Sequence, residues 1–346
     1  MRKGVLLVNL GSPDSPSVKD VRKYLTQFLN DKYVIDINPM ARFFLVNFII
    51  VPFRAPKSAK LYEQIWTSEG SPLIVHSKKQ KELLQKELDN TSSLPSMEED
   101  KYIVELGMRY QNPSIESAFK KLVEKKVESI VVIPLYPQWA SSSTESSVVE
   151  IKRVAKKFVP MNIPMKISEK FYEDENYLTA LISVAGKYTM NDYDFFVFSY
   201  HGLPERQIKK IYPNYCGINN TCCSSISEKN KFCYRAACYY TTRELVRRLN
   251  IPEGKYITSF QSRLDDKWLK PYSDKVIAEK AKQGVKKMLV FSPAFAADCL
   301  ETIYEIGTEY DELFRKHGGE KLQLVESLNE NHTWIECLKK MVIDNQ

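Results

Sequence analysis

A histidine at the end of an apolar run is the first residue whose position suggests chemistry. His201 is one of only four histidines, and it ends the apolar run 195–201, which is followed by Gly202 and Pro204. Such a run, broken by glycine and proline, predicts a strand and then a turn. We therefore expect the imidazole at the carboxyl end of a strand, where open α/β sheets bind ligands. The alternative is a turn histidine that hydrogen-bonds its neighbours.

Three carboxylates follow a second apolar run, residues 290–292. After the break at Pro293 come Asp298, Glu301 and Glu305, at steps of three and four residues. This spacing predicts a helix that carries all three acids on one face. Carboxylates stacked on one helix face beside a strand end can bind a hard cation or relay protons. The alternative is that the three acids form a solvated face of the helix.

Length and composition are those of an enzyme with a substantial core. The chain has 346 residues, of which 43% are hydrophobic and 27% charged, and its formal net charge is +7. This length fits two domains. The positive charges are not concentrated in an arginine-rich tract, so we do not expect nucleic-acid binding. Residues 1–3 lead directly into an apolar strand rather than a signal peptide, so we expect a cytoplasmic protein.

The order of apolar runs predicts the fold. Most of the runs are separated by segments long enough for a helix, which is typical of α/β proteins with parallel sheets covered on both faces. The predicted strands are 5–9, 102–107, 129–135, 165–168, 195–200, 256–261, 288–292 and 322–325. We expect two similar α/β domains, each a mainly four-stranded parallel sheet flanked by helices, with an active-site cleft between them. The predicted domains are residues 1–165, with about 326–346 packing on them, and residues 166–325.

Residues after the first-half strands suit a large planar ligand. Aromatic rings can stack on its faces, and Arg109 can pair with an anionic group. The candidates for substrate binding are Asn9, Met108, Arg109, Tyr110, Tyr136, Trp139, Ser143 and Thr144. Each aromatic residue taken singly is also a core candidate. Gly11 stands alone after the first strand and lacks the glycine spacing of a phosphate-binding loop, so we expect no nucleotide.

Residues 40–53 are unusually apolar. This segment is too short, and is broken too early by Pro52, to span a bilayer. A buried helix is the simpler interpretation. The flanking residues Arg42, Arg54 and Lys57 are basic, however, so peripheral contact with a membrane surface is the alternative.

Together these stretches resemble the ferrochelatase family, whose members insert ferrous iron into a porphyrin. The resemblance covers nearly the whole chain in family order. The matching stretches are 7–13, 24–31, 70–73, 107–110, 136–139, 199–204, 261–262, 268–271 and 297–302.

The resemblance implies that the two α/β domains are Rossmann-like, and it implies a reaction and roles for named residues. Fe²⁺ would enter protoporphyrin IX with release of two protons, and His201 and Glu301 would face each other across the porphyrin centre, acting on protons and binding the incoming iron. Glu305 and Asp298 would assist them. Met108, Tyr110, Tyr136, Trp139 and Trp268 would be wall residues, and Arg109 the partner of a propionate. Alternatives are a coproporphyrin III or cobalt chelatase and, in a different class, a non-enzymatic heme-binding or iron–sulfur sensor protein.

Residues 212–238 hold five of the seven cysteines: Cys216, Cys222, Cys223, Cys233 and Cys238. Such clustering in a cytoplasmic protein indicates a metal rather than disulfides. Four thiolates can bind Zn²⁺ or a [2Fe–2S] cluster, and the spacing alone does not distinguish these. Because some ferrochelatases carry a [2Fe–2S] cluster, the resemblance favours the cluster. Cys238 is the least certain ligand, and metal-free thiols are the remaining alternative.

Overall fold

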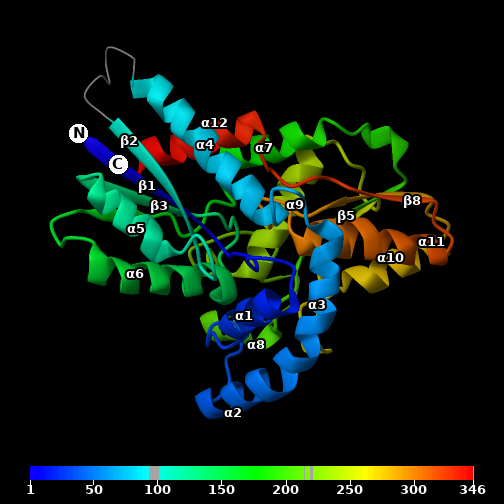
Figure 1. The fold of residues 1–346 in the computed structure, drawn as a ribbon. Helices are drawn as coiled ribbons and strands as arrows, with labels where there is room; N and C mark the ends of the chain where they lie inside the picture. The colour runs from blue at the N-terminus through cyan, green and yellow to red at the C-terminus, as the bar shows by residue number, and fades with distance from the viewer. Residues whose placement is uncertain (93–100, 214, 219–220, 346) are drawn as a thin grey trace. The chain divides into compact units, whose positions relative to one another are not determined.

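The structure is a computed structural model, which describes residues 1–346 except 93–100, 214, 219–220 and 346. The chain forms two compact units. Unit 1 comprises Met1–Tyr136, Ser141–Glu169 and Trp334–Gln346, and unit 2 comprises Pro137–Ala140 and Lys170–Thr333. Each unit is built on one four-stranded sheet (Figure 1).

Unit 1 contains a parallel sheet with the strand order β2-β1-β3-β4. Its strands are β1 (Arg2–Asn9), β2 (Lys101–Met108), β3 (Ser129–Pro134) and β4 (Met165–Ile167). Its helices are α1 (Val18–Leu29), α2 (Pro39–Phe44), η1 (Leu45–Ile50), α3 (Val51–Ile65), α4 (Pro72–Ser92), α5 (Ile115–Glu124), η2 (Ser141–Glu145), α6 (Ser146–Phe158) and most of α12 (His332–Asp344).

Side chains along the strands of unit 1 point alternately to the two faces of the sheet, and those on one face form a hydrophobic core. Leu6 and Val8 of β1 pack with Phe119 of α5 and Ile151 of α6, and all four are fully buried. Figure 1 shows α5 and α6 on this face and α4 on the other. Because helices cover both faces, the strands read as continuous apolar runs in the sequence.

Unit 2 repeats this arrangement with the strand order β6-β5-β7-β8, again with parallel pairs. Its strands are β5 (Phe195–His201), β6 (Tyr256–Gln261), β7 (Lys287–Phe291) and β8 (Lys321–Leu324). Its helices are α7 (Glu175–Ala185), η3 (Met190–Asp192), α8 (Glu205–Ile211), α9 (Tyr234–Arg248), α10 (Ser273–Lys282), η4 (Glu301–Tyr310) and α11 (Asp311–Lys316).

The two faces of the unit 2 sheet are covered by different helices. Val197 and Val290 pack with Ile277 of α10 and Ile306 of η4. On the opposite face, the hydroxyl of Tyr200 in β5 lies 3.0 Å from that of Thr242 in α9. All eight predicted strands are present, so the predicted pair of four-stranded parallel sheets flanked by helices is confirmed.

Several apolar side chains of residues 40–53 are exposed, whereas the simpler interpretation of the sequence was a buried helix. Phe43, Phe48 and Phe53 are 52%, 63% and 73% exposed. The backbone also stays helical through Pro52 instead of breaking there, with a π-helical stretch, η1, immediately before it. Proline lacks an N–H and clashes with the carbonyl four residues earlier, and the wider π-turn gives that carbonyl room.

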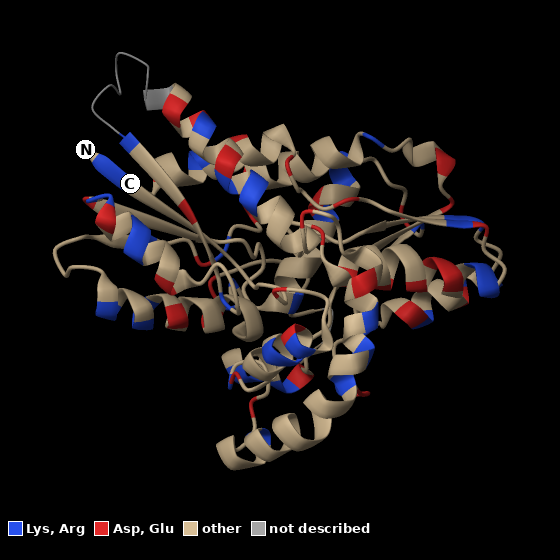
Figure 2. Cartoon of the chain, in the orientation of Figure 1, with Lys and Arg blue, Asp and Glu red and all other residues tan. Residues whose placement is uncertain are grey.

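The exposed segment carries few charges. Figure 2 shows α2 and the turns after it almost without charged residues, whereas α3 contains several basic residues. Among the residues that the structure describes, no helix combines the length and apolar character needed to cross a membrane.

Candidate functional site in unit 2

His201 is the last residue of β5, as the sequence predicted. Its Nδ1 lies 2.7 Å from the carbonyl oxygen of Gly202. A carbonyl only accepts hydrogen bonds, so Nδ1 carries the hydrogen, and in the neutral imidazole Nε2 keeps a lone pair. The ring lies 6.4 Å from that of Trp268, and the hydroxyl of Tyr234 donates to the His201 carbonyl at 2.9 Å. The half-buried imidazole is therefore held in one tautomer with an available nitrogen.

Gln261 joins three elements at the carboxyl edge of the sheet. It pairs with His201 in the parallel register, and its backbone carbonyl accepts from Gly202 N at 2.8 Å. Its side-chain oxygen accepts from the hydroxyl of Ser199 at 2.8 Å. Its side-chain nitrogen donates to the carbonyl of Glu301 at 2.9 Å and to the carboxylate of Glu305 at 3.1 Å. One amide thus fixes the start of η4 relative to the end of β5.

Glu305 is held by four donors. Besides Gln261, these are the backbone N–H and the hydroxyl of Ser262, at 2.8 and 2.5 Å, and the hydroxyl of Tyr310 at 2.8 Å. Ser262 takes a left-handed backbone conformation, with φ of 61°. Burial, reinforced by the negative charge of Glu305, raises the pKa of Tyr310, so this phenol stays a donor.

The helix that carries Glu301 is a π-helix rather than the α-helix that the spacing predicted. Its buried face is Thr302, Ile306 and Tyr310, four residues apart, as expected for a wider helical turn. Sequence periodicity misses a π-helix because a four-residue step also fits an α-helix.

Asp298 precedes the π-helix and is buried, with an exposure of 7%. Its carboxylate accepts from the hydroxyl of Thr302 at 2.8 Å, from Ser327 N at 3.2 Å and from the side-chain nitrogen of Asn329 at 2.7 Å. These donors tie the loop after β8 to the start of η4. The carboxylates of Asp298 and Glu305 are therefore held by separate sets of donors.

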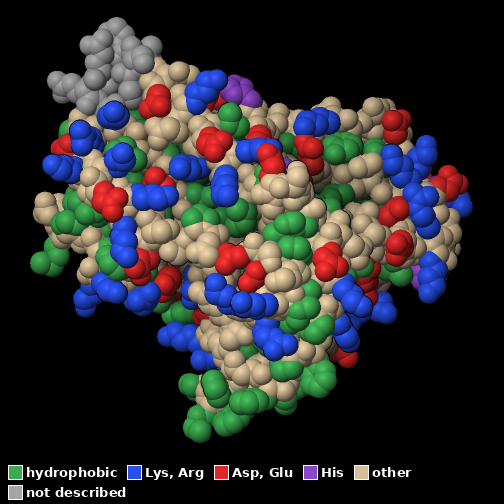
Figure 3. All heavy atoms as spheres, in the orientation of Figure 1, with side chains coloured by type: hydrophobic (Ala, Val, Ile, Leu, Met, Phe, Trp, Pro, Cys, Tyr) green, Lys and Arg blue, Asp and Glu red, His purple; other side chains and the backbone are tan. Residues whose placement is uncertain are grey.

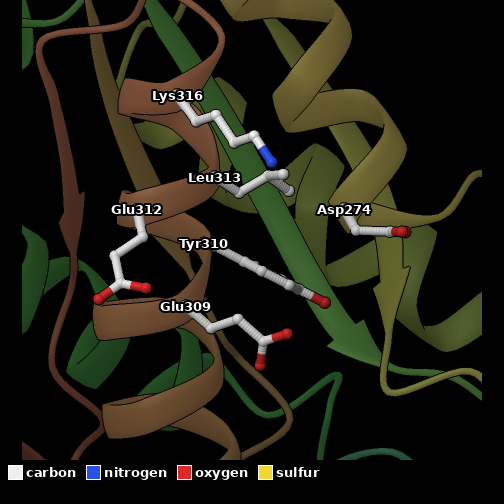
Figure 4. Close-up of a pocket in the computed structure, with 6 residues that line it drawn as sticks. All are labelled: Asp274, Glu309, Tyr310, Glu312, Leu313 and Lys316. Atoms are coloured by element: carbon white, nitrogen blue, oxygen red, sulfur yellow. The ribbon is translucent and has the colours of Figure 1, made fainter.

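A pocket of about 330 Å³ lies between α10 and the segment formed by η4 and α11. It is lined by Asp274, Glu309, Tyr310, Glu312, Leu313 and Lys316. In Figure 4 the carboxylate of Glu312 points away from Asp274, whereas Tyr310 extends toward it. The pocket shares Tyr310 with the donors that hold Glu305.

Arg109, predicted in unit 1 as a partner for an anionic ligand group, is engaged by Asp31. Its Nη2 pairs with this carboxylate, its Nε donates to the hydroxyl of Ser146 at 2.7 Å, and its guanidinium lies 4.5 Å from the ring centre of Tyr110. Burial acts to raise the pKa of Asp31, but hydrogen bonds from Ser146 and from Tyr33 N, and the charge of Arg109, outweigh it and lower the pKa.

The other predicted substrate-binding residues divide by burial. Asn9, Met108, Tyr110, Tyr136 and Thr144 are buried, and Ser143 and Trp268 are partly exposed. Trp139, also partly exposed, packs edge-on against Phe232 of the cysteine-rich segment, with ring centres 6.0 Å apart. Gly11 has φ of 106°, and a Cβ added there would lie 2.0 Å from the carbonyl oxygen of Tyr110, so only glycine fits between the segments that follow β1 and β2.

Four of the five clustered cysteines form a chain of sulfur contacts. The sulfurs of Cys222 and Cys223 lie 3.8 Å apart, Cys216 interacts with Cys222, and Cys223 interacts with Cys233. The hydrogen bond with Cys223 lowers the pKa of Cys233. Cys238 is fully buried beside Tyr234, and burial raises its pKa well above the ordinary value. Buried Asn230 braces the loop by donating to the carbonyls of Cys222 and Ser225, at 2.9 and 2.8 Å.

Comparison with known proteins places the chain in a family. Its sequence matches the ferrochelatase family over residues 2–346. The chain belongs to the ferrochelatase family. It is 42% identical over 343 residues to the ferrochelatase of Coxiella burnetii (strain CbuK_Q154), which covers 98% of this chain and 92% of the relative. It is 43% identical to that of Pseudomonas fluorescens (strain SBW25), with 97% and 96% covered, and 40% identical to that of Legionella pneumophila (strain Lens), with 99% of both covered.

Among solved structures, SirB from Bacillus subtilis with Fe³⁺ aligns with a TM-score of 0.49 at 15% identity, covering 100% of this chain and 94% of that one. The ferrochelatase relatives confirm the resemblance seen in the sequence. The protein is an enzyme that inserts metal into porphyrin, and its function lies in heme biosynthesis. The cobalt chelatase and sensor alternatives are not favoured.

Gln261 and Ser262 are site residues that the sequence prediction did not include. Gln261 is the last residue of a predicted strand and Ser262 follows it, which is the same signal that selected His201. Their importance comes from the bonds they make to Glu305, which only the fold reveals.

We predict that Gln261→Glu destabilises unit 2 in a pH-dependent way. The new carboxyl would face the Glu305 oxygen that now lies 3.1 Å from the amide nitrogen. The loss is expected to be about 2–4 kcal/mol of unfolding free energy near neutral pH. Because the new carboxyl's pKa is raised in the folded state, the deficit should be smallest below about pH 4 and grow as pH rises.

Thermal unfolding of the variant and the wild type across pH measures this deficit. Gln283→Glu is the matched control, since its exposed amide nitrogen donates to Glu279 at 3.0 Å. Solvent screens that pair, so the control should change little. Equal deficits for the two variants would contradict the role assigned to Gln261.

Proposed function

We propose that the protein inserts Fe²⁺ into protoporphyrin IX, with His201 and Glu301 acting at the porphyrin centre. The observation that carries the proposal is the bond from His201 Nδ1 to the Gly202 carbonyl, which leaves Nε2 to accept a proton or bind the incoming metal. Insertion forms iron–nitrogen bonds and releases two pyrrole protons, so the site needs a base and a route for protons. Glu301 starts η4 beside the edge that His201 occupies, because Gln261 bonds to both elements.

Glu305 and Asp298 support this pair in different ways. Glu305 follows Glu301 by four residues on the same helix and receives protons passed on from it, while Ser262 and Tyr310 hold its carboxylate in place. Asp298 is a positioning residue, because its bonds to Thr302 and Asn329 hold the first turn of η4.

Substitution of either central residue tests these roles. His201→Ala and Glu301→Ala should each lower the rate of heme formation by about 10²–10⁴-fold, the usual contribution of a positioned acid or base. Formation of heme from Fe²⁺ and protoporphyrin IX under anaerobic conditions measures this. His317→Ala and Glu312→Ala are matched controls in unit 2 and should retain activity. Heme formation within a few-fold of the wild type by His201→Ala would remove this imidazole from the chemistry.

For binding the porphyrin, we propose roles for the remaining predicted residues. Trp139 and Trp268 are partly exposed aromatic walls, and Asn9, Met108, Tyr110, Tyr136, Ser143 and Thr144 shape or support the binding surface. A guanidinium has five N–H groups. The bonds from Arg109 to Asp31 and Ser146 use Nη2 and Nε, so its Nη1 side is the proposed contact for a propionate.

We also propose that residues 40–53 rest on a membrane surface, at the cytoplasmic side. Six apolar side chains are exposed here: Met40, Phe43, Phe44, Phe48, Ile49 and Phe53. Figure 3 shows them as a patch at the bottom of the view, with basic residues above it. An apolar tip bordered by basic side chains suits an anionic lipid surface. Contact with lipid would also bring the protein to a hydrophobic porphyrin.

Vesicle binding tests the membrane proposal. The double variant Phe43→Ser/Phe48→Ser should bind phosphatidylserine-containing vesicles at least about tenfold more weakly, because burying one phenylalanine contributes about 1.5–3 kcal/mol. Met161→Ser, at an exposed apolar residue elsewhere in unit 1, is the control. Sedimentation with vesicles gives the affinities. Unchanged binding of the double variant, or no binding by the wild type, would contradict the proposal.

We further propose that Cys216, Cys222, Cys223 and Cys233 hold a [2Fe–2S] cluster. The donor set fits, because the 3.8 Å between the sulfurs of Cys222 and Cys223 matches two thiolates on one tetrahedral metal at about 2.3 Å each. When bound, such a cluster supplies a structural cross-link or one-electron redox sensing. Cys238 is left out because its thiol hydrogen-bonds with the hydroxyl of Tyr234.

Metal analysis tests the cluster proposal. The protein purified under anaerobic conditions should absorb in the visible range and contain two irons and two sulfides per chain, the composition of a [2Fe–2S] cluster. Cys222→Ser and Cys233→Ser should lose most of this content, whereas Cys238→Ser should keep it. A colourless protein that contains zinc would refute the iron–sulfur assignment. Loss of the cluster in Cys238→Ser would show that Cys238 is needed and that the proposed set of four ligands is wrong.

A further inference from the structure

A buried cation lies against the cysteine group. Arg235 is the second residue of α9 and is 5% exposed. Its Nη1 donates to the sulfur of Cys223 at 3.0 Å, and its Nη2 donates to the hydroxyl of Tyr239 at 3.1 Å. The guanidinium also lies 4.5 Å from the ring centre of Tyr239. Contacts with Cys223 and Tyr239 therefore fix the orientation of the guanidinium.

The contact with Cys223 places a fixed positive charge at the sulfurs. A guanidinium stays protonated in proteins, and an anion beside it offsets the cost of burying it. A metal group on four thiolates is anionic, and the N–H to sulfur contact points directly at one of its proposed ligands.

We propose that Arg235 is a positioning residue that carries the counter-charge of the metal group and orients the Cys223 sulfur. The inference rests on the proposed [2Fe–2S] cluster. Four thiolates, two sulfides and two ferric ions sum to a charge of −2, and uptake of one electron makes it −3. A fixed cation stabilises the more negative state more strongly, so Arg235 raises the reduction potential of the cluster.

A second arginine of α9 contacts the backbone of the cysteine loop instead of a sulfur. Arg243, two turns further along α9, donates to the backbone carbonyl of Cys223 at 3.1 Å and so holds the loop rather than the sulfur. Arg247 on the same helix is mostly exposed and pairs with Glu244 at 2.8 Å. Arg247 therefore supplies a control for loss of one positive charge from α9.

The test compares Arg235→Gln, Arg235→Lys and Arg247→Gln with the wild type. Redox titration under anaerobic conditions gives the midpoint potential, and iron and sulfide analysis gives the cluster content. Arg235→Gln should lower the potential, Arg235→Lys should stay closer to the wild type, and Arg247→Gln should not change it. A cluster-loaded Arg235→Gln protein with the wild-type potential would overturn the inference.

Loss of the cluster is also informative. If Arg235→Gln loses it while Arg235→Lys and Arg247→Gln retain it, the need for a charge is supported. If Arg235→Lys loses it as well, the charge is not what matters and the inference fails.

A wild-type protein that holds zinc would refute the iron–sulfur proposal but not the inference. Competition with a chelator would then be expected to show about 10- to 100-fold weaker zinc binding by Arg235→Gln than by Arg247→Gln. A wild-type protein without either metal group would overturn both.

Discussion

The side-chain amide of Gln261 is the interaction on which the site in unit 2 depends. A parallel sheet brings strand ends to one edge, but it does not fix a helix that follows another strand. Gln261 does so by accepting from Ser199 and donating to the carbonyl of Glu301 and to the carboxylate of Glu305. A neutral amide with separate donor and acceptor atoms is the side chain that can join a hydroxyl, a carbonyl and a carboxylate at once. The positions of Glu301 and Glu305 therefore follow from the register of β5 and β6.

At two separate places, a buried guanidinium lies against a group that carries or can carry negative charge. In unit 1, Arg109 and Asp31 compensate each other, and the hydroxyls of Tyr110 and Ser146 complete the carboxylate's hydrogen bonds. In unit 2, Arg235 contacts a sulfur instead of a carboxylate. The guanidinium of Arg109 is matched by a carboxylate, and that of Arg235 lies against a proposed ligand of the metal group.

Much of the fold was predictable because the relevant signals are local. Continuous apolar runs between helical segments indicated all eight strands, and His201 was correctly expected at a strand end. The π-helix at Glu301–Tyr310 was not predictable, since its four-residue spacing also fits an α-helix. The exposure of Phe48 and Phe53 was missed because apolar composition favours burial unless a partner surface is known. Gln261 was missed because its importance lies in contacts 40 and more residues away along the chain.

The π-helix also has a consequence for how this chain tolerates changes in length. A π-turn contains about one residue more than an α-turn, so η4 holds surplus backbone between two fixed points, the loop at Asp298 and the start of α11 at Asp311. Deleting one residue within it would let the segment wind as an α-helix without moving either end far. The residue removed would be the one that the wider turn adds, so the residues on either side of the deletion would keep nearly the same facing. Elsewhere in a helix, a deletion rotates everything beyond it by about 100° and disturbs packing first, whereas here it would spare the core.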